Sequence, residues 1–263
     1  MNIYFKNMST IYSLYEGSYS VDKTKVFKPF DPEIHDPKDR PGSLFIHVHP
    51  FLIDTFHGLV LCDAGLGYRQ EDGELIITEN IRKLGFSPLE VRYVLMSHLH
   101  QDHVGGLADR QTGEITFPNA KYVIQEGEWQ LARKTADPEE QEIFDILEKS
   151  NNMLFVEGDG EVDGFIEFKH SGAHTANHQV FFIDTELGKC FFGGDVLPEP
   201  EELFVSFVAK YDQDGKLARD LRKQYWEKGR EEGWIYLFYH SKNITIGKAE
   251  QKSDGTFKLV DAV

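Results

Sequence analysis

The chain has 263 residues, of which 40% are hydrophobic and 27% charged, a composition typical of a soluble globular protein that can bury one large core. Its formal net charge of −16 disfavours a nucleic-acid partner, because nucleic-acid binding needs Lys and Arg to neutralise phosphates. No run approaches the roughly 20 apolar residues that span a bilayer, so we expect no membrane partner. The length of the chain predicts a single domain over residues 1–263.

The N-terminal region gives two expectations. Residues 1–20 lack the basic and then apolar regions of a signal peptide, which predicts a cytoplasmic protein. Residues 29–42 are rich in Pro and Asp and are expected to form a long loop. Because long loops in compact domains often serve function, residues 1–42 are interpreted as a candidate lid or interface segment, and a homodimer is left open.

The first half of the chain alternates apolar runs with turn signals. Strands are expected over residues 44–48, 51–56, 59–62 and 91–96, and a helix is expected after an N-cap at Thr78, with Gly85 as its stop. Cys62 and Cys190 both lie in apolar, strand-like runs. Neither has a Cys or His at ligand spacing, so both are interpreted as buried thiols.

The second half mixes helices with strands. Helices are expected over residues 126–133, from an N-cap at Asp137, and over residues 216–232. Strands are expected over residues 153–156, 165–169, 179–184, 189–192 and 235–239, and Asp254-Gly255 predicts a C-terminal hairpin turn. This order is no repeated βαβ pattern. It favours a layered α/β sandwich with sheets inside and helices outside.

A dense group of metal-ligand residues follows the strand expected over residues 91–96. His98, His100, Asp102 and His103 lie within six residues, on an expected strand-to-helix loop. Four polar groups that converge in a tight loop need a partner, and a divalent cation supplies one. The alternative, a solvated histidine-rich loop, fits a lone histidine better than it fits this spacing.

A two-metal hydrolytic site needs further ligands and a bridging carboxylate. Candidates stand where predicted strands end: His174 between two strands, Asp195 after Gly193-Gly194, and His240 after the strand over residues 235–239. Taken singly, each is compatible with an ordinary turn residue. Together with the histidine cluster, they are interpreted as the remaining ligands.

These motifs resemble those of the metallo-β-lactamase superfamily. The HxHxDH motif of that family is complete at residues 98–103, and residues 61–65 resemble its early Asp-containing turn. Residues 172–178 resemble its GHTPGH segment, with an extra Ala before His174 and with Ala and Asn in place of Pro and Gly. The resemblance covers roughly residues 44–250 and implies the four-layer αβ/βα sandwich of the family.

The resemblance also implies a ligand set for two divalent metal ions. His98, His100 and His174 would hold one ion, and Asp102, His103 and His240 the other. Asp195 would bridge both, which makes Asp102 and Asp195 the expected catalytic carboxylates. Zinc is the first choice of metal, although iron, manganese and cobalt suit the same donors.

Further residues receive weaker assignments. Asp63 would orient a metal-bound imidazole from outside. His178 is expected behind the ligands or beside the substrate, with a plain surface position equally open. The other histidines have no matching role and are expected to be structural or exposed; they are His35, His47, His49, His57 and His170.

The expected chemistry is metal-assisted hydrolysis of a small-molecule substrate. Two cations about 3.5–4 Å apart lower the pKa of a shared water towards 7, and the resulting hydroxide would attack a carbonyl or phosphoryl centre. No Ser or Cys nucleophile is required, so no covalent enzyme intermediate is expected.

Within the superfamily the chain is most similar to the lactonases that open N-acyl homoserine lactones. Residues 51–53, 98–107 and 117–120, and Tyr211-Asp212, carry this likeness. One departure concerns the substrate side: those lactonases place a Tyr three residues after the bridging Asp, where this chain has Pro198. Phe204, Phe207 and Tyr211 are candidates for lining an acyl-chain pocket, against the alternative of core or lid packing.

Rival functions share the same metal site. Thioesterases of the glyoxalase II type resemble two-domain chains with a basic C-terminal substrate site, and RNA-processing relatives carry basic surfaces, neither of which this sequence shows. A phosphodiesterase is a further alternative. From other classes, an iron-dependent redox or persulfide-oxidising enzyme and a non-catalytic binding protein stay open, and iron content with redox activity would separate the former from a hydrolase.

Overall fold

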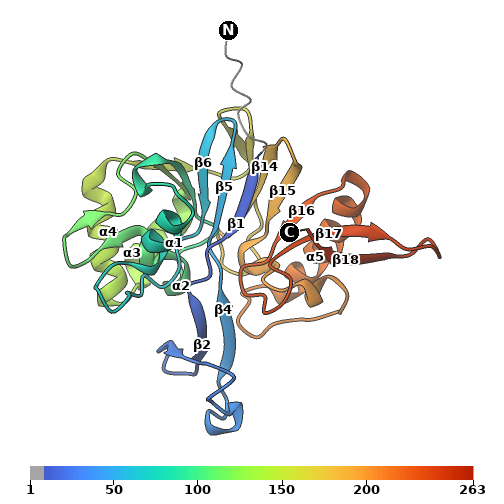
Figure 1. The fold of residues 1–263 in the computed structure, drawn as a ribbon, viewed down its shortest axis with the longest axis horizontal. Coiled ribbons are helices and arrows are strands. Elements are labelled where there is room, and N and C mark those ends of the chain that lie inside the picture. The colour runs from blue at the N-terminus through green and yellow to red at the C-terminus, as the bar shows by residue number, and fades with distance from the viewer. Residues whose placement is uncertain (1–8, 263) are drawn as a thin grey trace.

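Two large β-sheets face each other in the computed structural model, which describes residues 9–262 (Figure 1). The expectations that residues 1–20 do not form a signal peptide and that the chain is a single domain rest partly on residues 1–8 and 263, which lie outside this range. The first sheet has the strand order β1-β5-β6-β7-β10-β11. Its strands are β1 Thr10–Ser13, β5 Phe51–Thr55, β6 Gly58–Cys62, β7 Val91–Leu95, β10 Lys121–Gln125 and β11 Met153–Val156.

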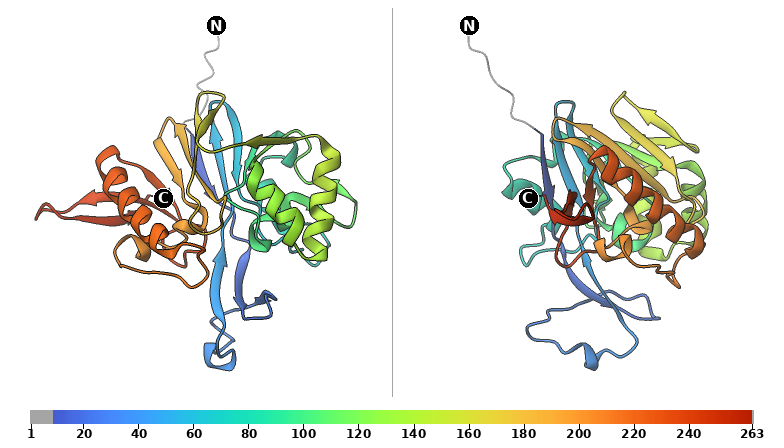
Figure 2. Two further views of the ribbon diagram at one scale, coloured as in Figure 1. Left: turned by 180° about the vertical axis from the view of Figure 1, so that it is seen from behind. Right: turned by 90° about the vertical axis from the view of Figure 1, so that its right-hand side faces the viewer.

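The second sheet contains seven strands in sequence order from β12 to β18. They are β12 Gly160–Val162, β13 Ile166–His170, β14 Gln179–Thr185, β15 Gly188–Phe192, β16 Ile235–Leu237, β17 Ile246–Gln251 and β18 Phe257–Asp261. Helices cover the outer faces of the two sheets: α1–α4 lie on one side and α5 on the other (Figures 1 and 2). The helices are α1 Ile76–Lys83, α2 Gln101–Val104, α3 Glu126–Thr135, α4 Pro138–Ser150 and α5 Gly215–Glu232.

The molecule has four layers: a helix layer, two β-sheets and a second helix layer. Because side chains alternate along the strands, three apolar clusters fill the spaces between these layers. In β5, Leu52 packs in the cluster under α1, α3 and α4, whereas Phe51 and Ile53 pack between the two sheets. In β14, Phe181 packs between the sheets and Phe182 packs in the cluster that includes residues of α5. Successive residues of a strand point to opposite faces, so strands buried on both faces must be apolar throughout. The α/β four-layer αβ/βα sandwich is therefore confirmed.

A small third sheet leaves the body of the molecule near its N-terminus. It has the strand order β3-β2-β4, and β2 and β4 extend below the rest of the chain in the view of Figure 1. Its strands are β2 Gly17–Val21, β3 Lys28–Pro29 and β4 Leu44–Val48. The loop expected over residues 29–42 joins β3 to β4 and includes one short 3-10 helix, Pro37–Asp39. We call residues 17–48 the N-terminal arm.

The remaining elements are short. A two-stranded sheet pairs β8 Ala108–Asp109 with β9 Glu114–Ile115, and further 3-10 turns lie at Pro88–Glu90, Gly105–Leu107, Gly194–Val196 and Pro200–Leu203. Cys62 and Cys190 are free and buried, as expected. No helix in residues 9–262 combines the length and the apolar character needed to cross a membrane.

Two boundary predictions are wrong. Thr78 is not an N-cap: α1 begins at Ile76 after Leu75, and the Thr78 hydroxyl donates to the Leu75 carbonyl within the helix at 2.8 Å. The last strand before His240 ends at Leu237, two residues before the end of its apolar run at Tyr239. The backbone turns away after Leu237, and the His240 N–H donates to Pro198 O at 3.0 Å.

Candidate metal centre

The predicted ligands gather where parallel strands of both sheets end. Strands β6 and β7 run parallel and lead to Asp63 and to the segment after Leu95, while β15 and β16 run parallel and lead to Asp195 and His240. The carboxyl ends of parallel strands meet at one edge of a sheet, where binding sites commonly form. His174 joins them from the loop between β13 and β14.

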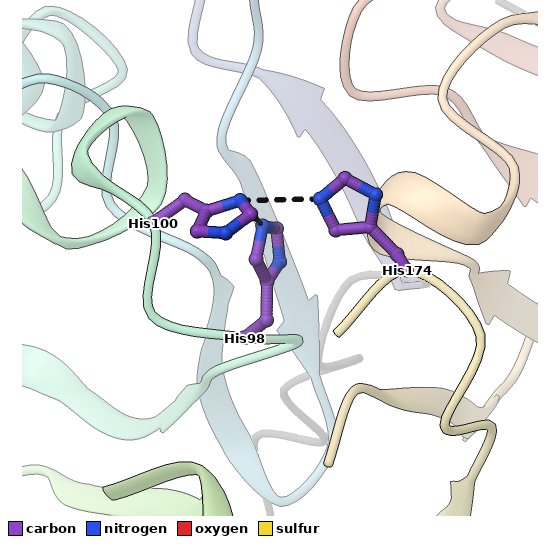
Figure 3. Close-up of side chains that lie close together, drawn as sticks. All are labelled: His98, His100 and His174. Atoms are coloured by element: carbon purple, nitrogen blue, oxygen red, sulfur yellow. Dashed lines mark hydrogen bonds between the residues drawn. The ribbon is translucent and has the colours of Figure 1, made fainter. Parts of the chain in front are cut away.

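Three histidines, His98, His100 and His174, form the first half of the site, which we call the first triad. The His98 Nε2 and His100 Nδ1 atoms are 2.9 Å apart, and His174 Nε2 is 3.1 Å from the same His100 nitrogen (Figure 3). Two ring nitrogens this close to a third form a compact donor set of the size that holds one metal ion.

Asp102, His103 and His240 form the second half of the site, which we call the second triad. The Asp102 Oδ2 atom lies 3.8 Å from His103 Nε2 and 3.4 Å from His240 Nε2. Their donor atoms also lie close enough together to hold one ion. All three residues are buried.

Asp195 stands between the two halves and turns one oxygen to each. Its Oδ2 is 3.5 Å from His174 Nε2 and 3.9 Å from His98 Nε2. Its Oδ1 is 3.4 Å from His103 Nε2 and 3.3 Å from His240 Nε2. A single carboxylate therefore faces both triads, as expected of a bridging ligand.

Outer hydrogen bonds fix which ring nitrogen His98, His103 and His240 turn inward. His103 Nδ1 donates to Asp63 at 2.7 Å, and His240 Nδ1 donates to the His47 carbonyl at 2.7 Å. The Ser97 hydroxyl donates to Asp63 at 2.6 Å and lies 3.0 Å from His98 Nδ1, from which its oxygen can then accept. These bonds leave the Nε2 atoms free to act as ligands, which is how outer groups orient metal-bound imidazoles.

Electrostatics differ between the halves. Burial, together with the neighbouring His103 and His100, holds the pKa of His98 well below its usual range, and burial with His174 lowers the pKa of His100 to about 4. Burial would also lower the pKa of His103, but Asp195, Asp102 and Asp63 raise it well above the usual range. His98 and His100 are therefore neutral imidazoles that can act as ligands. The carboxylates around His103 favour positive charge, which a divalent cation would supply in place of a proton.

Unsatisfied atoms at the centre support the same assignment. Among residues 9–262, His103 Nε2 and Asp195 Oδ1 are buried and have no hydrogen-bond partner, although they lie only 3.4 Å apart. Buried polar atoms without partners are rare in native proteins and call for an unseen ion or water. The donor set therefore fits a metal centre.

The structure resolves the open position of His178. This residue is fully buried, so the surface alternative is wrong. Its Nδ1 lies 2.7 Å from the Ser171 hydroxyl, and its Nε2 accepts from the Asp195 backbone N–H at 3.3 Å. It stands behind Asp195 and holds that segment in place.

The other histidines stay outside the centre. His47 and His49 bond the hydroxyls of Ser18 and Ser13 at 2.6 and 2.8 Å, and His170 bonds the Ala176 carbonyl at 3.0 Å. His57 stacks on Phe165 and His35 on Phe30, with ring centroids 4.3 and 5.8 Å apart.

Asp212 and Tyr239 are among the supporting residues that the sequence did not predict. Asp212 accepts from His174 Nδ1 at 3.0 Å with a side chain that has no exposed surface. Tyr239 stacks on His103 with ring centroids 4.3 Å apart and donates to the Asp102 carbonyl at 2.8 Å. In the sequence, the Tyr211-Asp212 pair is visible only as a likeness to lactonases, and Tyr239 only as part of an apolar run.

A cavity of about 200 Å³ opens over the centre. Its floor includes ligands from both triads, and its apolar wall comes from the N-terminal arm through Val21, Phe27, Leu44 and Ile46. Of the three aromatic candidates, Tyr211 lines this cavity, whereas Phe204 borders a separate groove with Trp226, and Phe207 lies against Arg222. Pro198 and Glu199 complete the wall.

Comparison with known families identifies the chain. The family described as the Metallo-beta-lactamase superfamily matches residues 45–233, more than half of the sequence. The chain belongs to the metallo-β-lactamase superfamily. The resemblance inferred from the HxHxDH motif is thereby confirmed, and the chain is a metallo-β-lactamase-fold hydrolase similar to lactonases.

Individual relatives within the superfamily agree. An N-acyl homoserine lactonase of Bacillus sp is 26% identical over 225 residues, which cover 76% of this chain and 84% of that protein. The N-acyl homoserine lactonase AiiA of Bacillus thuringiensis subsp. kurstaki is 26% identical over 220 residues, with the same coverage.

Solved structures show the same fold. A probable metal-dependent hydrolase from Staphylococcus aureus has a TM-score of 0.75 at 24% identity and covers 98% of this chain and 100% of its own. AidC, described as a dizinc quorum-quenching lactonase, has a TM-score of 0.70 at 18% identity and covers 98% and 96%.

Proposed function

We propose that this superfamily member is a dinuclear metal-dependent lactonase that opens N-acyl homoserine lactones. The observation that carries the proposal is the position of Asp195, whose two oxygens each face one triad of metal-ligand side chains. His98, His100 and His174 would hold one ion and Asp102, His103 and His240 the other, with zinc as the first choice. When bound, two such ions supply a water of lowered pKa and polarise the carbonyl under attack.

The chain's own residues orient the reaction. Asp63 and Asp212 hold His103 and His174 through their Nδ1 atoms and so present the Nε2 atoms to the centre. Asp102 and Asp195 are the acidic groups of the inner site, and Asp102 lines the cavity floor beside the substrate position. We assign to Asp102 the uptake of a proton from the attacking water and the transfer of that proton to the departing alkoxide.

The cavity supports a lactone with an acyl chain as substrate. Its inner end carries the polar donor set, and its outer wall is the apolar face of the N-terminal arm. A neutral lactone with an aliphatic tail matches both surfaces, because the tail gains free energy by leaving water against Phe27 and Leu44. The arm would then act as the lid expected for residues 1–42.

Metal analysis and activity in one preparation test the proposal. We expect about two metal ions per chain, and hydrolysis of N-acyl homoserine lactones that is lost on chelation and restored by zinc. Two ions without lactone turnover would move the substrate to another ester, a thioester or a phosphodiester. No bound metal, with no recovery on adding zinc, manganese or iron, would overturn the proposed chemistry. Iron with redox activity would favour the persulfide-oxidising alternative.

Tyr211 is expected to donate a hydrogen bond to the substrate. Pro198 stands where the similar lactonases have a Tyr, so another residue must supply the hydroxyl. Among the residues that line the cavity, Tyr211 alone carries a hydroxyl, and its ring lies 5.8 Å from that of His174. Tyr211→Phe should lower kcat/KM for the lactone roughly three- to tenfold, the value of one neutral hydrogen bond. Metal content should not change. Steady-state kinetics check this, and an unaltered kcat/KM would show that the hydroxyl does not touch the substrate.

A further inference from the structure

Glu128, in the first turn of α3, joins the two segments that supply the first triad. Its side chain is buried, with Oε1 accepting from the Leu99 N–H at 3.2 Å and Oε2 from the Thr175 hydroxyl at 2.8 Å. Leu99 lies between His98 and His100, and Thr175 follows His174. One carboxylate therefore fixes the spacing of two loops that are distant in sequence.

Glu16, between β1 and β2, has the corresponding place beside the second triad. It is buried, and its two oxygens accept from the N–H groups of Leu66 at 2.6 Å and Tyr68 at 3.0 Å. Both donors belong to the turn that follows Asp63. Backbone N–H groups can only donate, and the Glu16 carboxylate supplies an acceptor for each of these two.

The turn held by Glu16 lies directly against the backbone of the second triad. Ala64 N–H donates to His103 O at 2.8 Å, and Gly105 N–H donates to Gly65 O at 2.8 Å. A Cβ on Gly105 would lie 1.9 Å from Leu66 O, so the two backbones have no space between them. A shift of the turn must move the segment that carries Asp102 and His103.

We infer that Glu128 and Glu16 are positioning residues that each set the metal affinity of one half of the centre. The inference rests on the proposed function of the site. Neither glutamate bonds a ligand side chain, so each acts through the backbone of the ligand segments. Burying a carboxylate costs free energy unless its oxygens accept hydrogen bonds. The oxygens of Glu128 accept from the segments that carry the first triad, and those of Glu16 accept from the turn that packs against the second triad.

Glutamine variants separate the two roles. Gln has nearly the same shape as Glu, but its amide NH₂ cannot accept a hydrogen bond. In Glu16→Gln, one of the two backbone N–H donors therefore loses its partner. In Glu128→Gln, either the Leu99 N–H loses its partner or the Thr175 hydroxyl must turn from donor to acceptor. Each triad is measured alone. The His240→Ala background removes a ligand of the second triad and leaves the first intact, and the His174→Ala background does the opposite. Metal-free protein is titrated with Co²⁺, and the visible absorption gives the Kd and reports the coordination.

We expect Glu128→Gln to weaken Co²⁺ binding roughly tenfold in the His240→Ala background and less than about threefold in the His174→Ala background. Glu16→Gln should show the reverse. Glu90→Gln, which changes a capping glutamate whose carboxylate accepts from Ser87 N–H at 2.7 Å, is the matched control and should leave both Kd values unchanged.

The pattern decides between positioning and general support. Equal weakening of both halves by both variants, or no change in either, would overturn the inference, since a merely structural role would not distinguish the halves. Wild-type protein that binds no Co²⁺ would instead sink the proposed metal centre, and this inference with it. Selective weakening supports both.

Discussion

Replacing Asp195 with asparagine is expected to lower kcat/KM by more than about a thousandfold, equivalent to about 4 kcal/mol of transition-state stabilisation. The Asp195 oxygens lie 3.3–3.5 Å from the nearest ring nitrogens of His240, His103 and His174. In asparagine one oxygen becomes an NH₂ group, which cannot ligate a metal and turns its hydrogens toward an imidazole. Loss of a residue that only supports a metal ligand lowers metal affinity or activity about 10–100-fold. Asp195 faces both triads directly, so its loss should have a larger effect.

The charge of Asp195 matters as much as its shape. Burial would raise its pKa, but His103 and His240 lower that pKa well below the usual range, so the residue is a carboxylate at neutral pH. Metal content should therefore fall together with activity, to about one ion per chain or fewer. Asp184→Asn, which changes an exposed aspartate 3.4 Å from the Lys189 ammonium, is the matched control. Full metal content and activity in Asp195→Asn would contradict the bridging assignment.

The residues expected as metal ligands lie together in the structure, and the sequence could point to them because metal ligands are chemically restrictive. His98, His100, Asp102 and His103 stand at motif spacing after an apolar strand, and the structure brings His174, Asp195 and His240 to the same point. Strand ends could be located from apolar runs, and these residues followed the runs directly. Asp63, too, lies where the early turn predicted it, 2.7 Å from His103 Nδ1.

The outer support could not be predicted in the same way. Glu128 stands in the first turn of a helix, where an acidic side chain is ordinarily explained by the helix dipole. Nothing in the local sequence shows that it is buried against Leu99. Asp212 lies in a loop of polar residues, and only the three-dimensional structure brings it to His174, 38 residues away along the chain.

The N-terminal arm shows a second limit of the sequence. Residues 17–48 contain three strands, β2 and β3 before the Pro-rich loop and β4 after it. Strand β2 was not predicted because its pairing partner, β4, is distant in sequence. Its register, Tyr19 opposite Ile46, depends on that long-range pairing. Strand propensity is weak evidence without the partner strand.

A buried ion pair beneath the loop of Tyr211 gives the largest expected change in stability. Arg222 of α5 is 2% exposed and pairs with Glu202, and it also donates to the Phe207 carbonyl at 2.9 Å. Glu202→Gln removes the charge that compensates the buried guanidinium. The free energy of unfolding should fall by about 3–5 kcal/mol, the usual cost of leaving one member of such a pair alone.

Urea unfolding of the metal-free protein measures this change without a contribution from metal binding. Arg219→Gln on the same helix breaks a partly exposed pair with Asp220 and should alter the free energy of unfolding by less than about 1 kcal/mol. The double variant Glu202→Leu/Arg222→Met should recover most of the loss, because an apolar pair avoids the cost of burying charge. A loss below about 1 kcal/mol in Glu202→Gln would show that water reaches Arg222. In that case the loop that carries Tyr211 and Asp212 must be held mainly by its bonds to the His174 segment, where Gln213 N–H donates to the His174 carbonyl at 3.1 Å.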